Sequence, residues 1–352
     1  MFDDAFQDRV RHVMERARLR GLAMSAAVGE GEPEFLCLGT DAGEQPVEPD
    51  SLSPVASITK LATALTALRL VDRGSLALDA PLAAYLPEAV SAAHDGVTLR
   101  RLLSHTSGLP LDLPANAAPY ADGLDWPTLA AACLGTTLER PPATRVQYSN
   151  VGYGLLAATV ERTTGQSFPD ALGELVLRPL EIEGYLGTEP PRPPLQMAGV
   201  RGPHKGTPHE TFNSPFWRSL AMPWAGLVTS PRGALALVRA FLGTPQGFLR
   251  PETRSEATSN QAGDLAGGFV RPLIWGKCPW GLGPELRGEK SPHWAPSEAG
   301  PDSFGHSGAS GCVAWASPSR GAVWIVLGTR VADSGWLLRQ GAELGRMVLE
   351  TL

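Results

Sequence analysis

Ser57 and Lys60 are spaced so that their side chains could act together. Apolar residues at steps of three and four predict a helix that begins near Ser57, and positions i and i+3 lie on one face of a helix. The lysine amine would then reach the serine hydroxyl, while burial and the helix N-terminus would both disfavour the ammonium form. A neutral lysine can take the serine proton and create a nucleophile. The same spacing also fits a serine cap followed by a solvated lysine.

A second segment offers Tyr148 and Asn150 in a predicted loop before a helix. A phenol beside a cationic lysine would have a lowered pKa and could relay protons, and an asparagine side chain offers both a donor and an acceptor. We expect the Lys60 amine to lie within hydrogen-bond reach of both the Ser57 and Tyr148 hydroxyl groups. Taken alone, this segment also fits an Asn150 helix cap and a packing tyrosine.

The third segment, His306-Ser307-Gly308, precedes a strand-like run that begins at Cys312. Its small residues would let a substrate lie along the edge of a strand. In isolation, the segment is equally typical of a glycine-rich turn before a strand.

The elements that must position these segments change in character along the chain. Alternating apolar residues predict strands near 22–40 and again near 311–329, whereas 76–200 shows short helical patterns between loops rich in proline and glycine. We therefore predict an α+β fold in which one antiparallel sheet is built from both termini and flanked by the first and last helices. The expected domains are 1–75 with 201–352, and a mainly helical region 76–200, with the active site between them.

Composition excludes several kinds of partner. The formal net charge is −6 and no block of lysine and arginine stands out, so we expect neither nucleic acid nor an anionic membrane as a partner. No apolar run approaches the ~20 residues of a membrane span, and the acidic start differs from a secretory leader. These features favour a cytoplasmic protein.

Cysteine and histidine placement indicates no cofactor. The four cysteines have no close spacing, so buried free thiols are expected rather than a disulfide framework. His204 and His209, with Glu210, lack the spacing of a helical metal site and are interpreted as loop residues. His105, in a turn-like segment, is expected to have a structural hydrogen-bonding role. We predict that the protein uses neither a metal nor another cofactor.

The three segments, in this order, resemble the serine β-lactamase and penicillin-binding-protein family, in particular its class C β-lactamase-like group, which includes esterases and D-amino-acid peptidases. The resemblance extends roughly from Phe6 to Leu349. Further segments carry it: Leu102 to Leu109, Tyr148 to Leu156, Thr164 to Phe168, Arg178 to Leu180, Ala225 to Ser230 and Phe304 to Gly311.

The resemblance implies roles for individual residues. Ser57 would be the nucleophile, Lys60 and Tyr148 would share the acid and base work, and Asn150 would orient Lys60 and the substrate. The backbone N–H groups of Ser57 and Ala309 would form the oxyanion hole, with Gly308 beside them in the third motif.

The third motif departs from the family pattern at one position. The lactamases and penicillin-binding proteins usually have lysine where this chain has His306. A neutral imidazole would bind a substrate carboxylate less strongly than a permanent cation, which favours neutral esters.

These observations predict a serine hydrolase that forms an acyl-enzyme with small esters or amides, most simply a carboxylesterase. The alternatives are a β-lactamase or D-amino-acid peptidase and, from another class, a catalytically silent ligand-binding or sensor domain on the same fold. The complete set of Ser57, Lys60 and Tyr148 argues against the silent domain.

Overall fold

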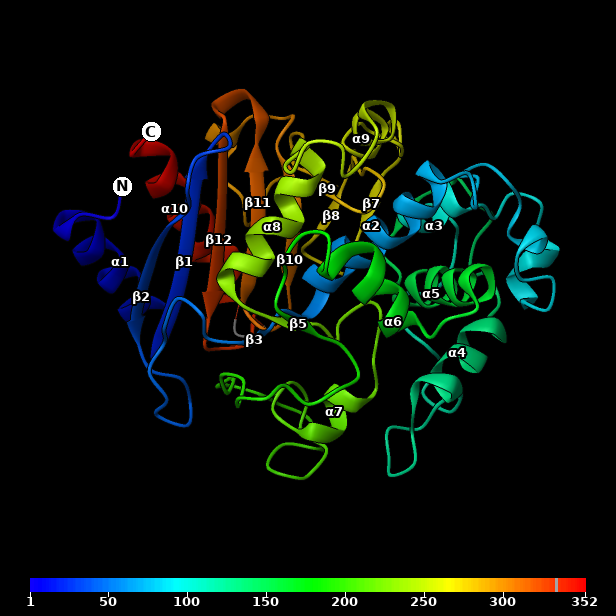
Figure 1. Cartoon of the computed structure of the whole chain (residues 1–352), viewed down its shortest axis with the longest axis horizontal. Coiled ribbons are helices and arrows are strands. Elements are labelled where there is room, and N and C mark those ends of the chain that lie inside the picture. The colour runs from blue at the N-terminus through cyan, green and yellow to red at the C-terminus, as the bar shows by residue number, and fades with distance from the viewer. Residues whose placement is uncertain (333–334) are drawn as a thin grey trace.

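The computed structural model describes residues 1–332 and 335–352. Its centre is a six-stranded antiparallel sheet with the order β2-β1-β12-β11-β10-β9 (Figure 1). The strands are β1 (Gly21–Val28), β2 (Glu34–Gly39), β9 (Glu285–Leu286), β10 (Phe304–Gly308), β11 (Cys312–Ser317) and β12 (Ala322–Gly328). Met24 of β1 pairs with Val326 of β12, so the two ends of the chain share one sheet, as the sequence predicts.

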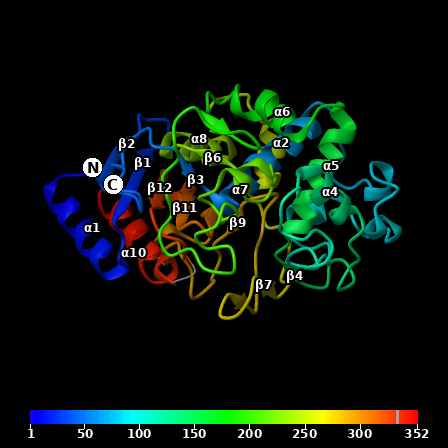
Figure 2. The same cartoon turned by 90° about the horizontal axis from the view of Figure 1, so that it is seen from below.

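Both faces of this sheet are covered, which explains why its central strands are apolar throughout. Successive side chains of a strand point to opposite faces. Trp324 and Val326 therefore face a core shared with the terminal helices α1 (Asp4–Ala17) and α10 (Trp336–Glu350). Val323 and Ile325 face the other core, which α8 (Pro231–Leu242) covers. Figure 2 shows α1 and α10 together at one end of the molecule, with α4 and α5 at the other.

The segment 76–200 contributes most of the remaining helices, in agreement with the predicted helical insertion. They are α3 (Leu99–Leu103), α4 (Trp126–Leu134), α5 (Asn150–Thr164) and α6 (Phe168–Leu172), the last continuing into a π-helical turn (Gly173–Leu177). Helix α2 (Thr59–Asp72) packs against α5, and twelve of its fourteen residues are buried. The other helices are α7 (Pro215–Ser219) and α9 (Pro251–Ala257).

Two small sheets tie this region to the rest of the chain. One has the order β3-β6-β5 and the other β4-β7-β8. Their strands are β3 (Ser53–Pro54), β4 (Val146–Gln147), β5 (Gly184–Tyr185), β6 (Val228–Thr229), β7 (Gly267–Gly268) and β8 (Ile274–Trp275). One apolar core includes Leu65 of α2, Tyr153 of α5 and Ile325 of β12, so packing is continuous between sheet and helices. The division into two domains stays a prediction.

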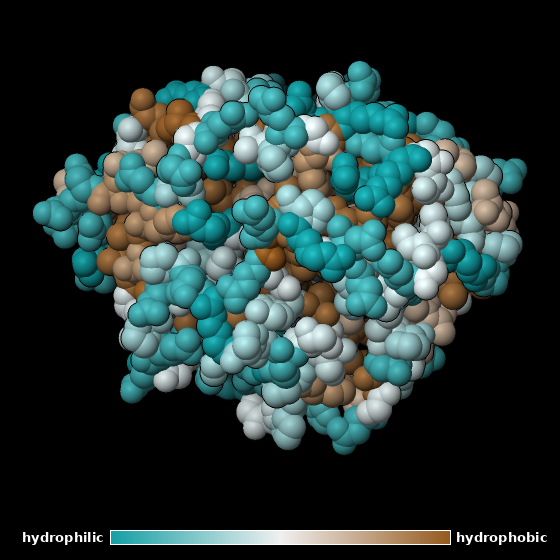
Figure 3. All heavy atoms as spheres, in the orientation of Figure 1, coloured by the Kyte–Doolittle hydropathy of each residue, from teal (hydrophilic) through white to brown (hydrophobic). Residues whose placement is uncertain are grey.

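None of the described helices is long and apolar enough to cross a bilayer. The face drawn in Figure 3 is mainly hydrophilic, with hydrophobic residues in separate patches. The cytoplasmic location inferred from the sequence stays a prediction.

The buried Trp324 side chain tests the packing of the terminal helices against the sheet. Trp324 is fully buried between β12 and the terminal helices. Replacing it with alanine should lower the free energy of unfolding by about 3–5 kcal/mol, because the removed ring leaves a cavity. Val28→Ala, at a side chain that is 51% exposed, is the control and should change stability by less than about 0.5 kcal/mol. Urea unfolding measures both, and similar losses in the two variants would contradict the packing.

Candidate active site

Ser57 lies in a 3₁₀ turn, Ala56–Ile58, that leads directly into α2. Ala56 has a φ of 45°, in the left-handed region that non-glycine residues seldom adopt. The turn is held by Thr59, whose hydroxyl donates to the Ala56 carbonyl at 2.6 Å and accepts from the Leu227 N–H at 3.0 Å. A strained backbone that is fixed by hydrogen bonds presents Ser57 in one orientation.

The end of β10 packs closely against this turn. A Cβ atom added at Gly308 would lie 2.5 Å from the Val55 carbonyl oxygen and 2.4 Å from Cys312 Sγ, so only glycine fits. The Cys312 thiol donates to the same carbonyl at 3.2 Å. Absence of a side chain at Gly308 therefore lets β10 and the Ser57 turn form one wall of the site. All four cysteines are free thiols, as expected, but only Cys133, Cys278 and Cys312 are buried, whereas Cys37 is partly exposed.

Lys60 is fully buried, and its amine donates to Asn150 Oδ1 at 2.7 Å and to the Trp224 carbonyl at 3.0 Å. Burial lowers the pKa of Lys60 well below its ordinary value, and the nearby charge of Asp112 opposes this shift. A neutral amine has two N–H groups and one lone pair. The two acceptors match the two N–H groups and leave the lone pair free.

Asp112 is the site residue that the sequence analysis missed. Its carboxylate accepts from Asn150 Nδ2 at 2.5 Å, so the opposite end of that amide, Oδ1, must face Lys60. The only sequence signal was an acidic residue between Leu111 and Leu113, shortly after the segment that contains His105. An isolated charge in a loop does not reveal its partner.

Tyr148 lies beside Lys60 but differs from the expectation in two ways. The Lys60 amine lies 4.5 Å from the centre of the Tyr148 ring, and neither of its hydrogen bonds goes to Tyr148 or to Ser57. Burial raises the pKa of Tyr148 well above its ordinary value, although the adjacent Ser57 hydroxyl opposes the shift. The expectation of a lowered pKa was wrong, because desolvation outweighs the effect of a lysine that is itself disfavoured as a cation. The phenol stays protonated.

His105 positions the Tyr148 segment, which agrees with its expected structural role. Its carbonyl accepts from the Gln147 N–H at 2.8 Å, its Nδ1 accepts from the Ser149 N–H at 3.0 Å, and its ring centre lies 4.5 Å from that of Tyr148. Burial lowers the pKa of His105 well below its ordinary value, which agrees with a neutral ring whose Nδ1 is an acceptor. Ser149, rather than Asn150, caps α5, with Oγ accepting from the Gly152 N–H at 3.0 Å. Asn150 is thereby free to contact Lys60.

Ser57 opens into a cavity of about 550 Å³ between the sheet and the helical region. Tyr148, Asn150, Gly308 and Ala309 also line it, and most of the remaining wall is apolar, from Leu111, Phe269, Val270, Leu273, Trp294, Leu337 and Leu338. Within the described chain, no backbone hydrogen bond uses the N–H of Ser57 or Ala309. These two donors are therefore available to a ligand in the cavity.

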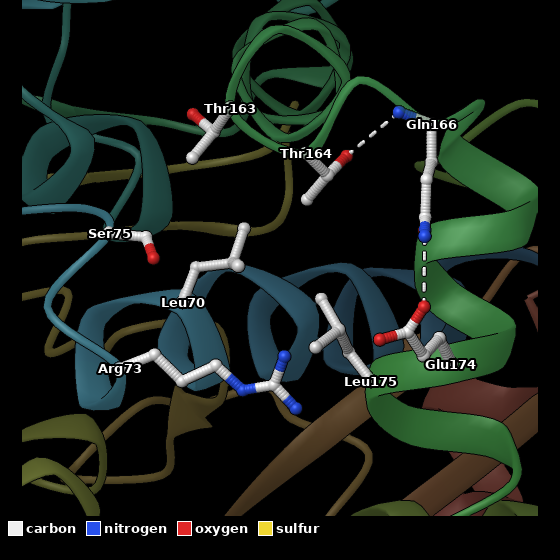
Figure 4. Close-up of a pocket in the computed structure, with 8 residues that line it drawn as sticks. All are labelled: Leu70, Arg73, Ser75, Thr163, Thr164, Gln166, Glu174 and Leu175. Atoms are coloured by element: carbon white, nitrogen blue, oxygen red, sulfur yellow. Dashed lines mark hydrogen bonds between the residues drawn. The ribbon is translucent and has the colours of Figure 1, made fainter.

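A second cavity, of about 230 Å³, lies at the other end of α2 (Figure 4). It is bordered by Leu70 and Arg73 of α2 and by Glu174, whose carboxylate accepts from Gln166. The helix rise of 1.5 Å per residue places Leu70 about 20 Å from Ser57. This cavity does not include the candidate nucleophile.

The histidines that were weighed as metal ligands have other partners. His209 Nε2 lies 2.7 Å from Asp122 Oδ1, and the His204 ring centre lies 4.9 Å from that of Tyr120. Over residues 1–332 and 335–352, no group of three potential metal ligands comes together.

Comparison with known proteins gives the family. A model of the beta-lactamase family matches residues 6–337. The chain belongs to the beta-lactamase family. Members of this family are serine hydrolases, and so is this protein.

Individual relatives within the beta-lactamase family differ in what they act on. The chain is 35% identical to Esterase EstB of Burkholderia gladioli over 266 residues, which are 66% of this chain and 67% of the esterase. It is 32% identical to the D-alanyl-D-alanine-carboxypeptidase/endopeptidase AmpH of Escherichia coli over 148 residues, which are 40% of this chain and 38% of that enzyme. A penicillin-binding-protein homologue from Caulobacter crescentus has a similar structure, with a TM-score of 0.76, 26% identity and coverage of 99% of this chain and 98% of that chain.

His306 occupies the position of the third motif, at which the resemblance to lactamases and penicillin-binding proteins led us to expect lysine. Its ring is fully buried, with its centre 5.8 Å from that of Tyr148 and 5.9 Å from that of Trp280. The following residues, Ser307 to Ala309, line the cavity, whereas the ring lies behind its wall. Burial lowers the pKa of His306 to about 4. The imidazole is therefore neutral, and its substrate-binding role stays a prediction.

A buried ion pair lies behind His306 and was not foreseen. Lys290 Nζ contacts Glu285 Oε1 at 2.8 Å with both side chains fully buried, and His293 Nε2 lies 3.4 Å from the same oxygen. Glu285 is opposite Gly305 in the β9–β10 pair, next to His306. The pair holds the pKa of Glu285 at about 2 against the cost of burial. Residues distant in sequence from the motifs thus set the charge around the third motif.

The lowered pKa of His306 makes a prediction about stability. Between pH 6.5 and 4, the unfolded chain binds a proton at this residue that the native protein does not, so stability falls as the pH is lowered. His306→Gln should reduce the loss of unfolding free energy between pH 7 and pH 5 by about 2 kcal/mol. Urea unfolding at the two pH values measures the loss, and the comparison between pH values cancels a uniform cost of the substitution. An unchanged loss would show that His306 is not held neutral.

Proposed function

We propose that this beta-lactamase family member is a carboxylesterase that hydrolyses small esters through an acyl-enzyme on Ser57. The observation that carries the proposal is the buried Lys60 amine, whose two hydrogen bonds match a neutral amine with a free lone pair. A buried neutral lysine one helical turn from a serine that follows a strained residue is suited to be a general base. The N-terminal turn of α2 holds the two residues together.

In the proposed reaction, the Ser57 proton moves to Lys60 Nζ as Ser57 Oγ bonds to the ester carbonyl carbon. The backbone N–H groups of Ser57 and Ala309 would stabilise the resulting oxyanion, and such a donor is often worth about 3–4 kcal/mol. When the bond to the leaving oxygen breaks, Tyr148, which is protonated at neutral pH, gives its proton to that oxygen and regains one from Lys60. A water molecule then attacks the acyl-enzyme by the same route and releases the acid.

The cavity and the relatives favour an ester over a β-lactam. The wall beyond the candidate catalytic groups is mainly apolar, and His306 is neutral where a lysine would supply a cation. The esterase relative matches two thirds of this chain, whereas the carboxypeptidase matches two fifths. A D-amino acid amidase from Ochrobactrum anthropi, at 21% identity, shares the fold. Lactamase and D-peptidase activities are the alternatives that a substrate panel compares directly.

Replacing the nucleophile and its base tests the proposal. Ser57→Ala should abolish hydrolysis of p-nitrophenyl butyrate. Lys60→Ala should lower kcat/KM nearly as far, because the loss of either member of a catalytic unit removes the function of the whole unit. Mass spectrometry of the wild type should find the acyl group on the peptide that contains Ser57. Nitrocefin, measured beside the ester, should be the poorer substrate. Full activity in Ser57→Ala would refute the serine mechanism, and a preference for nitrocefin would refute the esterase assignment.

Asp112 provides an independent test of Lys60 as the base. The charge of Asp112 raises the pKa of Lys60, so Asp112→Asn should lower that pKa further. Lys60 must be neutral to act, and the acid limb of the kcat/KM profile should therefore move to lower pH. Asp122→Asn, at an exposed carboxylate that pairs with His209, is the matched control and should leave the limb in place. A limb that stays fixed in Asp112→Asn would argue against Lys60 as the titrating base.

A further inference from the structure

Arg271 reaches the Ser57 cavity from the loop 269–273, which joins β7 to β8. The loop is anchored at Phe269, whose ring centre lies 4.3 Å from that of Tyr148, and the Tyr148 N–H donates to the Gly268 carbonyl at 3.1 Å. Two residues of extended chain span at most about 7 Å. The Arg271 side chain is therefore close enough to meet the far end of a small substrate that is bound at Ser57.

No described acidic side chain pairs with Arg271. Among the described residues that line the cavity, Arg271 alone carries a formal charge, and none is an aspartate or glutamate, although the chain as a whole has a net charge of −6. Several other arginines have acidic partners, as Arg100 has Asp79 and Arg218 has Glu189. Within residues 1–332 and 335–352, Arg271 forms no hydrogen bond or ion pair. The described lining of the cavity thus presents one unpaired cation.

The residues around Arg271 indicate what else a ligand that binds this cation would contain. Val270 is 58% exposed, the most exposed of the large hydrophobic side chains in the described chain, and Leu273 and Leu338 line the same cavity. A ligand that covers these side chains would gain free energy from burying them. An apolar arm with an anion at its end fits both features.

We infer that Arg271 binds a carboxylate at the end of an apolar arm of the substrate. Guanidinium groups bind carboxylates through two parallel N–H···O hydrogen bonds, which add direction to the charge attraction. The substrate class is then an ester that also carries a free carboxylate, such as a monoester of a medium-length dicarboxylic acid. This inference rests on the proposed esterase activity and names its substrate. It replaces the expectation of neutral esters, which was drawn from His306, with recognition of a charged ester at Arg271.

The test compares two esters that differ in one charge. The p-nitrophenyl monoester of octanedioic acid carries the carboxylate, and p-nitrophenyl octanoate is its neutral counterpart. The wild type should prefer the monoester in kcat/KM, and Arg271→Gln should lower the ratio of the two values by about tenfold. Arg271→Lys should give an intermediate ratio, because it keeps the charge and loses the paired geometry. Arg9→Gln, on α1, is the control and should keep the wild-type ratio.

Salt and binding measurements separate this inference from the proposed function. Raising the ionic strength from about 0.02 to 0.5 M should reduce the wild-type ratio and leave that of Arg271→Gln unchanged. In the Ser57→Ala background, calorimetry should show tighter binding of the monoester than of the octanoate ester, and Arg271→Gln should remove the difference. If both esters are hydrolysed through Ser57 and Arg271→Gln keeps the ratio, the inference is wrong and the esterase proposal stands. If neither ester is hydrolysed but binding depends on Arg271, the esterase proposal fails and the carboxylate site is supported.

Discussion

The burial of the Lys60 amine is the constraint on which the rest of the site depends. A buried ammonium ion without a paired anion is costly, so the amine is stable there mainly in its neutral form. Asn150 Oδ1 and the Trp224 carbonyl satisfy two N–H groups, and Asp112 sets the orientation of the Asn150 amide. Each of these partners comes from a different loop or helix. The fold must therefore bring together α2, α5, the loop that contains Asp112 and the segment that contains Trp224 before Lys60 can be a base.

The end of β10 in the central sheet forms another part of the site through close backbone packing. Gly308 brings the end of β10 against the Val55 carbonyl, and Thr59 ties the Ser57 turn to Leu227. These contacts leave the N–H groups of Ser57 and Ala309 without backbone acceptors within the described residues. A donor pair that is fixed before the substrate arrives needs no reorganisation during the reaction.

The sequence was sufficient for the architecture and for the candidate residues near Ser57. Alternating apolar residues near both termini predicted that the two ends of the chain share one sheet. The pairing of β1 with β12 confirms this prediction. The sequence did not predict which charged side chains lie beside the site in the folded chain. Asp112, Glu285 and Lys290 have no recognisable spacing relative to the motifs, and only the folded chain places them beside Asn150 and His306.

The pKa of Tyr148 shows why motif chemistry alone was misleading. A lysine neighbour suggested a lowered pKa, but the ring is packed among His105, Phe269 and Lys60, and desolvation dominates. The same burial that neutralises Lys60 keeps the phenol protonated, so one physical cause gives the two groups complementary proton states.

The most direct test of the central claim is the pH dependence of the rate at which a fluorophosphonate labels Ser57. If Lys60 is neutral and activates Ser57, the labelling rate should rise with the deprotonation of one group well below the ordinary lysine pKa of 10.5 and then reach a plateau. Lys60→Met should remove both the rapid labelling and this pH dependence. A rate that keeps rising toward pH 10, or rapid labelling of Lys60→Met, would contradict the account.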